Sequence, residues 1–216
     1  QHIAGVERDD DDTGFDRGRH RETSGAETFR QTPVLPSRAL GIDKKAEEIR
    51  RLVVQFVTLG VSKVRITGGE PLVRPDILDI ARYAVKLGFM VVFGTNGMLI
   101  DDRMAKTLVE IGVMGVGISI DSLDPAKHNA FRGVPGAWEA AVAGIEASRR
   151  NGLQFQIHFS AQPMNYQELP AVIDWAHRLG ARVLNVFFMV CTGRGEELTD
   201  ITPAQYEEVL GYLVTC

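Results

Sequence analysis

One carboxylate, Glu70, stands where a strand pattern gives way to a turn. It follows a mostly β-branched run at 64–67 and two glycines, Gly68 and Gly69, and it precedes Pro71. Because an amphipathic segment comes next, the pattern predicts a buried strand, a turn and then a helix. The glycines let a ligand approach the backbone closely, and Glu70 can accept hydrogen bonds from a cationic amine. A tight turn with an exposed glutamate is the alternative interpretation.

Polar residues and glycines also follow four later strand patterns. In open α/β sheets and in barrels, ligands bind at the carboxyl ends of parallel strands, because the loops leaving those ends converge. Such a rim suits a ligand with an amino-acid head and a ribose, since Asp121 can accept from sugar hydroxyls and Glu70 can hold an ammonium group. Beyond the first turn, the rim consists of Thr95, Asn96 and Gly97; Ser119, Asp121 and Ser122; Gln162 and Asn165; and Cys191 with residues 192–195.

The elements that would carry this rim follow a repeating order. Five times a helical pattern ends in a glycine and a strand pattern follows, with the glycines at 60, 88, 112, 152 and 180. The longest gap, between 112 and 152, has room for an extra helix around 125–131. Asp43 is a candidate cap for the first helix, and Thr202 with Gln205 forms a capping box for the last. The repetition predicts right-handed βαβ crossovers and a parallel sheet.

Strand parity favours a barrel over a flat sheet. Around 155–162 apolar residues alternate with polar ones, and the strand at 116–121 alternates in the same way. A doubly wound sheet would be apolar on both faces. We therefore predict an α/β fold, a partial TIM-type βα barrel with parallel strands, helices outside and a polar concave face, in which the first strand and its loop are missing.

Composition excludes several classes of protein. The 216 residues carry a net charge of -4, so there is no basic footprint for nucleic acid. The longest uncharged apolar run, 112–120, is too short to span a membrane. No signal-peptide pattern is present, so we expect a cytoplasmic protein. The two cysteines, Cys191 and Cys216, have no close spacing and form no cysteine-based metal motif.

The chain divides into two parts. Residues 1–38 are rich in aspartate and arginine and show no sustained apolar period, so we expect a disordered or ill-fitting segment. Residues 39–216 form the barrel domain, which we expect to be truncated at its C-terminus because the chain closes within a helical pattern.

Several motifs fall in order at the predicted strand ends, and together they resemble those of the radical S-adenosylmethionine (SAM) superfamily. Two later segments resemble its branch of haem-, cofactor- and peptide-maturation enzymes related to the molybdenum-cofactor enzyme. The resemblance covers roughly residues 41–214. Its motifs are Gly-Gly-Glu-Pro at 68–71 with Leu-Val-Arg-Pro after it, Thr-Asn-Gly at 95–97, Ile-Ser-Ile-Asp-Ser-Leu at 118–123, and the segments 131–138 and 192–197.

The resemblance implies a cosubstrate site and a chemistry. Such enzymes use a 4Fe-4S cluster to cleave S-adenosylmethionine reductively, and the 5'-deoxyadenosyl radical abstracts hydrogen from a small-molecule or peptide substrate. An electron donor is implied as a partner. The implied contacts are Gly68, Gly69 and Glu70 with the methionine amino group, Pro71 shaping the turn, Ser119 and Asp121 with the ribose and carboxylate region, Thr95 and Asn96 lining the same pocket, and Gln162 and Asn165 closing it.

The sequence departs from the family at the cluster motif. Members hold the cluster with three cysteines ahead of the Gly-Gly-Glu-Pro turn, whereas no cysteine precedes Cys191 here. Iron–sulfur clusters need thiolate donors. We therefore expect no metal ligands in this chain, no catalytic residue is assigned, and the chain is expected to be inactive as written.

Two other functions stay open from the residues. One is a non-catalytic barrel remnant that binds a ligand or a partner. The other is a metal-dependent barrel hydrolase or isomerase using Glu70, Asp121 and His158, which lack a compact metal-ligand spacing. His158 could equally be a satisfied interior histidine, and Arg132 could reach a carboxylate or cap a local turn.

Overall fold

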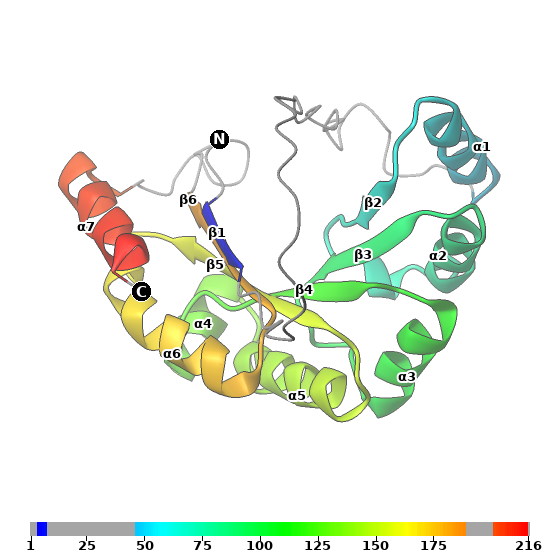
Figure 1. Cartoon of the computed structure of the whole chain (residues 1–216). Helices are drawn as coiled ribbons and strands as arrows, with labels where there is room; N and C mark the ends of the chain where they lie inside the picture. The colour runs from blue at the N-terminus through cyan, green and yellow to red at the C-terminus, as the bar shows by residue number, and fades with distance from the viewer. Residues whose placement is uncertain (1–3, 8–45, 189–200, 216) are drawn as a thin grey trace, which may run out of the picture.

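The computed structural model describes residues 4–7, 46–188 and 201–215, which form one curved sheet with helices along its outer side (Figure 1). The sheet order is β1-β6-β5-β4-β3-β2. Strands β2 to β6 are parallel, and β1 pairs antiparallel with β6 at the edge. The strands are β1 (Ala4–Glu7), β2 (Lys63–Ile66), β3 (Met90–Thr95), β4 (Gly115–Ser119), β5 (Phe155–Ala161) and β6 (Val183–Phe188).

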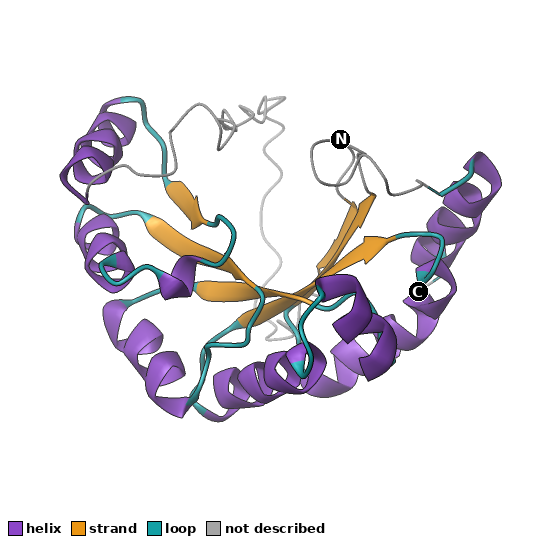
Figure 2. Ribbon diagram, turned by 180° about the vertical axis from the view of Figure 1, so that it is seen from behind, coloured by secondary structure: helices purple, strands orange, loops and turns teal. Residues whose placement is uncertain are grey.

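Helices return the chain between successive strands. They are α1 (Ala46–Thr58), α2 (Ile77–Lys86), α3 (Asp102–Ile111), α4 (Pro125–Arg132), α5 (Ala137–Arg150), α6 (Leu169–Leu179) and α7 (Pro203–Val214), with short 3₁₀ helices η2 (Pro71–Val73) and η3 (Tyr166–Glu168). All the described helices lie along the convex side of the sheet, so the opposite side is a concavity that no described helix covers (Figure 2). The predicted partial barrel is therefore confirmed. None of the described helices is long and apolar enough to cross a membrane.

The core lies between the convex face of the sheet and the helices. Apolar side chains of β3, β4 and β5 alternate toward this face and are at most 1% exposed; they are Phe93, Val116, Ile118, Ile157 and Phe159. Fully burying a side chain of this size contributes about 1.5–3 kcal/mol. Their burial on one face fixes the strand register, because a slip by one residue would turn them toward the concavity.

The concave face carries polar side chains and glycines, as strand parity predicted, together with Phe187 of β6, which packs edge-on against the ring of His158. Gly94 of β3 and Gly117 of β4 lie directly opposite each other in the ladder. Further along the sheet, the Nδ2 of Asn185 donates to the Oε1 of Gln156 over 3.1 Å. This face can therefore accept polar groups.

Several local predictions are confirmed. The extra helix is α4, and α7 begins with the capping box of Thr202 and Gln205. Within the predicted disordered segment, residues 4–7 form β1, an edge strand that the sequence pattern did not predict. Residues 8–38, Asp43 and both cysteines lie outside the described residues.

Candidate ligand site at the carboxyl ends of the strands

Glu70 joins the Gly-Gly-Glu-Pro turn to the end of β3. Its Oε1 accepts from the backbone N–H of Leu72 over 3.1 Å, which caps η2. The Thr95 hydroxyl lies 2.8 Å from Oε1 and 2.9 Å from Oε2, and the backbone N–H of Asn96 donates to Oε2 over 2.8 Å. Both carboxylate oxygens therefore hold the turn in place.

The loop after β3 is a tight turn stabilised by its own side chains. The Thr95 hydroxyl accepts from the N–H of Gly97 over 3.0 Å, and the Asn96 Oδ1 accepts from the N–H of Met98 over 2.9 Å. Gly97 has φ +79°, and a Cβ there would lie 2.7 Å from the Cγ2 of Ile118. Only glycine combines this backbone conformation with so close an approach to β4.

The two glycines before Glu70 are exposed and have free space above them. No heavy atom lies within 4 Å of the position that a Cβ would take at Gly68 or Gly69. Pro71, the first residue of η2, is buried behind them. The turn therefore presents backbone groups to a ligand without side-chain obstruction.

Asp121, which follows β4, is 1% exposed and is paired with Arg132 at the end of α4. The Arg132 Nε donates to Oδ2 over 2.6 Å. Burial raises the pKa of the Asp121 carboxyl, although Arg132 and His128 act in the opposite direction. His128 and Arg132 are four residues apart, so both reach Asp121 from one face of α4.

His128 is buried and bonds to the backbone of the same aspartate. Its Nδ1 accepts from the backbone N–H of Asp121 over 3.2 Å, so this nitrogen carries no proton. Burial lowers the pKa of His128, even though the Asp121 charge raises it. The neutral ring therefore leaves Arg132 as the cation that faces Asp121.

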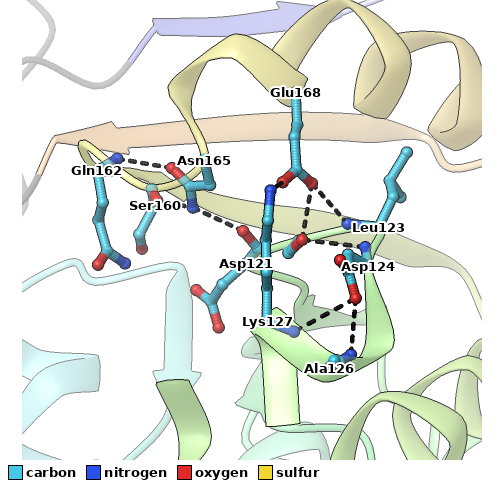
Figure 3. Close-up of polar contacts among 10 residues, drawn as sticks. Asp121, Leu123, Asp124, Ala126, Lys127, Ser160, Gln162, Asn165 and Glu168 are labelled. Carbon is cyan, nitrogen blue, oxygen red and sulfur yellow. Dashed lines mark hydrogen bonds and ion pairs between the residues drawn. The ribbon is translucent and has the colours of Figure 1, made fainter. Parts of the chain in front are cut away.

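Asn165 ties the end of β5 to the end of β4 (Figure 3). Its Oδ1 accepts from the N–H of Gln162 over 2.7 Å, and its Nδ2 donates to the carbonyls of Asp121 (2.6 Å) and Ser160 (2.9 Å). Asn165 is 1% exposed. All its described bonds are to the backbone, so it is a positioning residue for this edge.

Gln162 is 3% exposed, and its Nε2 has no hydrogen-bond partner among the described residues. In Figure 3 the side-chain ends of Gln162 and Asp121 extend to the same side, away from Glu168. A buried donor without a partner is costly, so a native structure that contains one points to an absent ligand or water.

Glu168 anchors the loop between β4 and α4. It accepts from the Ser122 hydroxyl (2.7 Å), the N–H of Leu123 (2.9 Å) and the Lys127 Nζ (2.9 Å). Burial raises the pKa of Glu168, but the bonds from Lys127, Ser122 and Leu123 outweigh it and lower the pKa. The sequence analysis missed Glu168, whose only signal is its place just before the helix pattern at Leu169.

The predicted site residues form two neighbouring groups. Glu70, Thr95 and Asn96 meet at the ends of β2 and β3, and Asp121, Gln162 and Asn165 meet at the ends of β4 and β5. Ser119 is half-buried at the last position of β4, between the two groups. The sequence analysis also missed His128.

The residues of the metal-dependent alternative do not converge. Glu70 is bound to the β3 turn, Asp121 to Arg132, and His158 to Arg65 across the sheet. Among the described residues, no group of three or more His, Cys, Asp or Glu could hold a metal ion.

Fold and site together define a half-barrel with a rim of polar residues at the strand ends. A family model described as the radical SAM superfamily matches residues 28–176. The chain therefore belongs to the radical SAM superfamily.

Its relatives include enzymes of haem and cofactor synthesis. The chain is 38% identical, over 76% of its length, to an AdoMet-dependent heme synthase of Methanosarcina barkeri, of which it covers 47%. It is 36% identical to a GTP 3',8-cyclase of Erythrobacter litoralis, over 71% of this chain and 47% of the relative. The chain thus spans about half the length of these curated relatives.

Solved structures share the fold. Streptococcus suis SuiB aligns with a TM-score of 0.67 at 19% identity, over 79% of this chain and 40% of that chain. AnSMEcpe with bound AdoMet aligns with a TM-score of 0.64 at 19% identity, over 79% of this chain and 50% of that chain.

The superfamily implies two groups, and the residues of this chain fit one of them. Iron–sulfur clusters are held by cysteine thiolates, but the 216 residues contain only Cys191 and Cys216, so three cysteine ligands are not available. S-adenosylmethionine does fit, because the rim offers open backbone at Gly68, the Arg132 cation and the Gln162 Nε2, which has no partner in the part of the chain that the structure describes.

Proposed function

We propose that this chain binds S-adenosylmethionine at the carboxyl ends of β2 to β5, as the half-barrel of a radical SAM protein of haem, cofactor or peptide maturation. The observation that carries the proposal is the buried Gln162 Nε2, which has no partner among the described residues and belongs to a side chain that extends to the same side as that of Asp121 (Figure 3). The names of the relatives support the class of chemistry, and the substrate would be a small molecule or a peptide.

The ammonium and the carboxylate of the methionine end share one carbon, so the groups assigned to them must reach the same part of the rim. The backbone of Gly68 and Gly69 binds the ammonium group, while the Glu70 carboxylate holds the turn that presents them. Arg132 is about one-third exposed (32%) and binds the carboxylate, because Asp121 fixes its guanidinium and leaves other N–H groups free to donate.

The nucleoside end is assigned to the residues that follow β3, β4 and β5. Ser119 and Asn96 contact the ribose hydroxyls, and the Gln162 amide donates to an acceptor on the ligand. Asn165 closes this part of the site by keeping the ends of β4 and β5 together. Asp121 acts through Arg132, which differs from the ribose contact that the family resemblance implied.

The chemistry of this chain stops at binding and orientation. S-adenosylmethionine supplies a sulfonium group that members of the superfamily cleave reductively. Cleavage needs an iron–sulfur cluster whose cysteines these residues do not provide, so we assign no reductive step and no electron donor to this chain.

Calorimetric titration with S-adenosylmethionine tests the proposal. We expect saturable binding that Gln162→Leu weakens roughly tenfold or more, because a buried hydrogen bond to the ligand is lost. Gln154→Leu, an exposed glutamine at the other end of β5, is the matched control and should leave the affinity unchanged. No binding by the wild-type chain, or equal binding by the Gln162 variant, would contradict the assignment.

The non-catalytic alternative rests on the same shortage of cysteines. Anaerobic reconstitution with iron and sulfide should leave the chain colourless, and binding without a cluster would then define a ligand-binding remnant. Brown protein with stoichiometric iron and sulfide would show instead that the chain assembles a cluster.

A further inference from the structure

Arg65 of β2 and His158 of β5 meet across the concave face, although β3 and β4 lie between their strands. The Nη2 of Arg65 lies 2.9 Å from the Nδ1 and 3.1 Å from the Nε2 of His158. This contact lies among the strands, inside the half-barrel, and the function assigned to the rim does not use it.

Two glycines make the contact possible. Gly94 and Gly117 are opposite each other in the ladder between the two side chains. A Cβ at Gly94 would lie 3.2 Å from the Arg65 Nε, and a Cβ at Gly117 would overlap the His158 ring. The arginine and the imidazole therefore occupy space that side chains at positions 94 and 117 would fill.

The pair carries a charge that no described acid balances. No carboxylate of the described residues forms an ion pair with Arg65, and its hydrogen-bond partner is the ring of His158. Burial, and then the charge of Arg65, lowers the pKa of His158 to about 3, so the ring is neutral and accepts the bond. Burial also lowers the pKa of Arg65, much of which is still exposed.

A guanidinium held in this way is suited to an oxyanion. Arginine presents a planar fork of five N–H donors that matches a carboxylate, and it is charged at every physiological pH. The bond to His158 occupies one nitrogen and sets the orientation of the fork. The Nε and Nη1 of Arg65 donate to no described residue, and no described helix covers the concave side of the sheet on which Arg65 meets His158 (Figure 2).

We propose that Arg65, oriented by His158 over Gly94 and Gly117, binds a carboxylate of the substrate inside the half-barrel. The inference rests on the proposed function, because it places the substrate on the concave face below the S-adenosylmethionine rim. A tetrapyrrole with carboxylate side chains and an acidic peptide share this chemistry.

Fluorescence titration of the full chain with coproporphyrin III tests the subsite. We expect Arg65→Gln to weaken binding roughly tenfold or more, because a charge-assisted bond is lost. Arg65→Lys should weaken it less, since the charge remains without the fork. Arg82→Gln is the control, because Arg82 lies on the outer helix α2 beside Asp79, and it should bind as the wild type does.

Titrations with two further probes identify the group that Arg65 binds. The tetramethyl ester of coproporphyrin III has the same ring without the carboxylates, and it should bind wild type and Arg65→Gln equally. A fluorescein-labelled poly-glutamate peptide tests the peptide source, and binding that depends on Arg65 in that arm alone would assign the carboxylate to a peptide. Equal affinities of wild type and Arg65→Gln for both acidic probes, or no saturable binding of either by the wild type, would overturn the proposal.

Circular dichroism melts of each variant show whether it is folded. Calorimetry with S-adenosylmethionine separates this subsite from the rim, since Arg65→Gln should keep wild-type affinity for that ligand. Loss of carboxylate binding with intact S-adenosylmethionine binding supports the subsite. Absent S-adenosylmethionine binding with Arg65-dependent carboxylate binding would contradict the proposed function alone.

Discussion

Asp121 and Arg132 are joined by a 2.6 Å contact between Oδ2 and Nε, which links the end of β4 to the end of α4. The carboxylate is 1% exposed, whereas Arg132 reaches the surface. Replacing a buried ion pair by apolar residues is often neutral or stabilising, so this pair is weak evidence for a role in stability. The arrangement therefore makes Asp121 a positioning residue for the cation of the rim.

Asp121→Asn should separate binding from folding. The amide keeps the shape but no longer holds the Arg132 guanidinium by charge, so we expect the affinity for S-adenosylmethionine to fall roughly tenfold. The exposed Asp174 of α6 gives the control, Asp174→Asn, with unchanged affinity. Calorimetry measures both, and wild-type affinity in Asp121→Asn would remove the positioning role.

Glu70→Ala should destabilise the fold as well as weaken binding. The substitution leaves the N–H of Asn96 and the hydroxyl of the buried Thr95 without their acceptor, so we expect a loss of about 2–3 kcal/mol in the free energy of unfolding. Urea unfolding measures it. Glu110→Ala, at an exposed position of α3, should change stability by no more than about 0.5 kcal/mol.

The glycines that end helices predicted much of the fold from the sequence. The five glycines at 60, 88, 112, 152 and 180, which were predicted to end helices, all have positive φ angles. Apolar alternation in β5 identified the convex face correctly, because only one face of the sheet is covered by helices. Strand β1 was missed, since four residues in a charged segment give no period to detect.

The candidate site was less readable, because its contacts join distant segments. The positions at the strand ends followed from the parallel topology. The hydrogen-bond partners of these residues could not be predicted in this way, because they are distant in sequence. Glu168 lies 46 residues after Ser122, and Arg65 lies 93 residues before His158. Nothing in the sequence indicated the bonds that Glu70 makes to Leu72, Thr95 and Asn96, and its contact with an ammonium group stays a prediction.

His158→Gln should change the pH dependence of stability. The pKa of His158 is about 3 in the folded chain and near 6.5 when unfolded, so the unfolded state takes up the proton first as the pH falls. Stability is therefore lost from about pH 6.5 downward, and this residue contributes a slope of about 1.4 kcal/mol per pH unit.

Urea unfolding between pH 7.5 and 4.5 measures this contribution. In His158→Gln the free energy of unfolding should depend less steeply on pH, by the contribution of about one proton. His128, whose pKa is also lowered, contributes to the slope of both the wild type and the variant. His177→Gln, at an exposed position of α6, should keep the wild-type slope. Parallel curves for wild type and His158→Gln would show that His158 titrates normally in the folded chain.

Gly97→Ala tests the close contact between the β3 turn and β4. Gly97 and Gly152 both have positive φ angles, +79° and +70°, so alanine at either position costs about 1–2 kcal/mol of backbone strain. Only at Gly97 would the added Cβ meet a core atom, the Cγ2 of Ile118 at 2.7 Å, whereas nothing lies within 4 Å at Gly152. Overpacking of this kind costs about a further 1–3 kcal/mol. Chemical unfolding should therefore rank Gly97→Ala below Gly152→Ala in stability by that difference. Equal losses would mean that the turn moves away from Ile118 without cost, and the turn that carries Asn96 would then be adaptable rather than preformed.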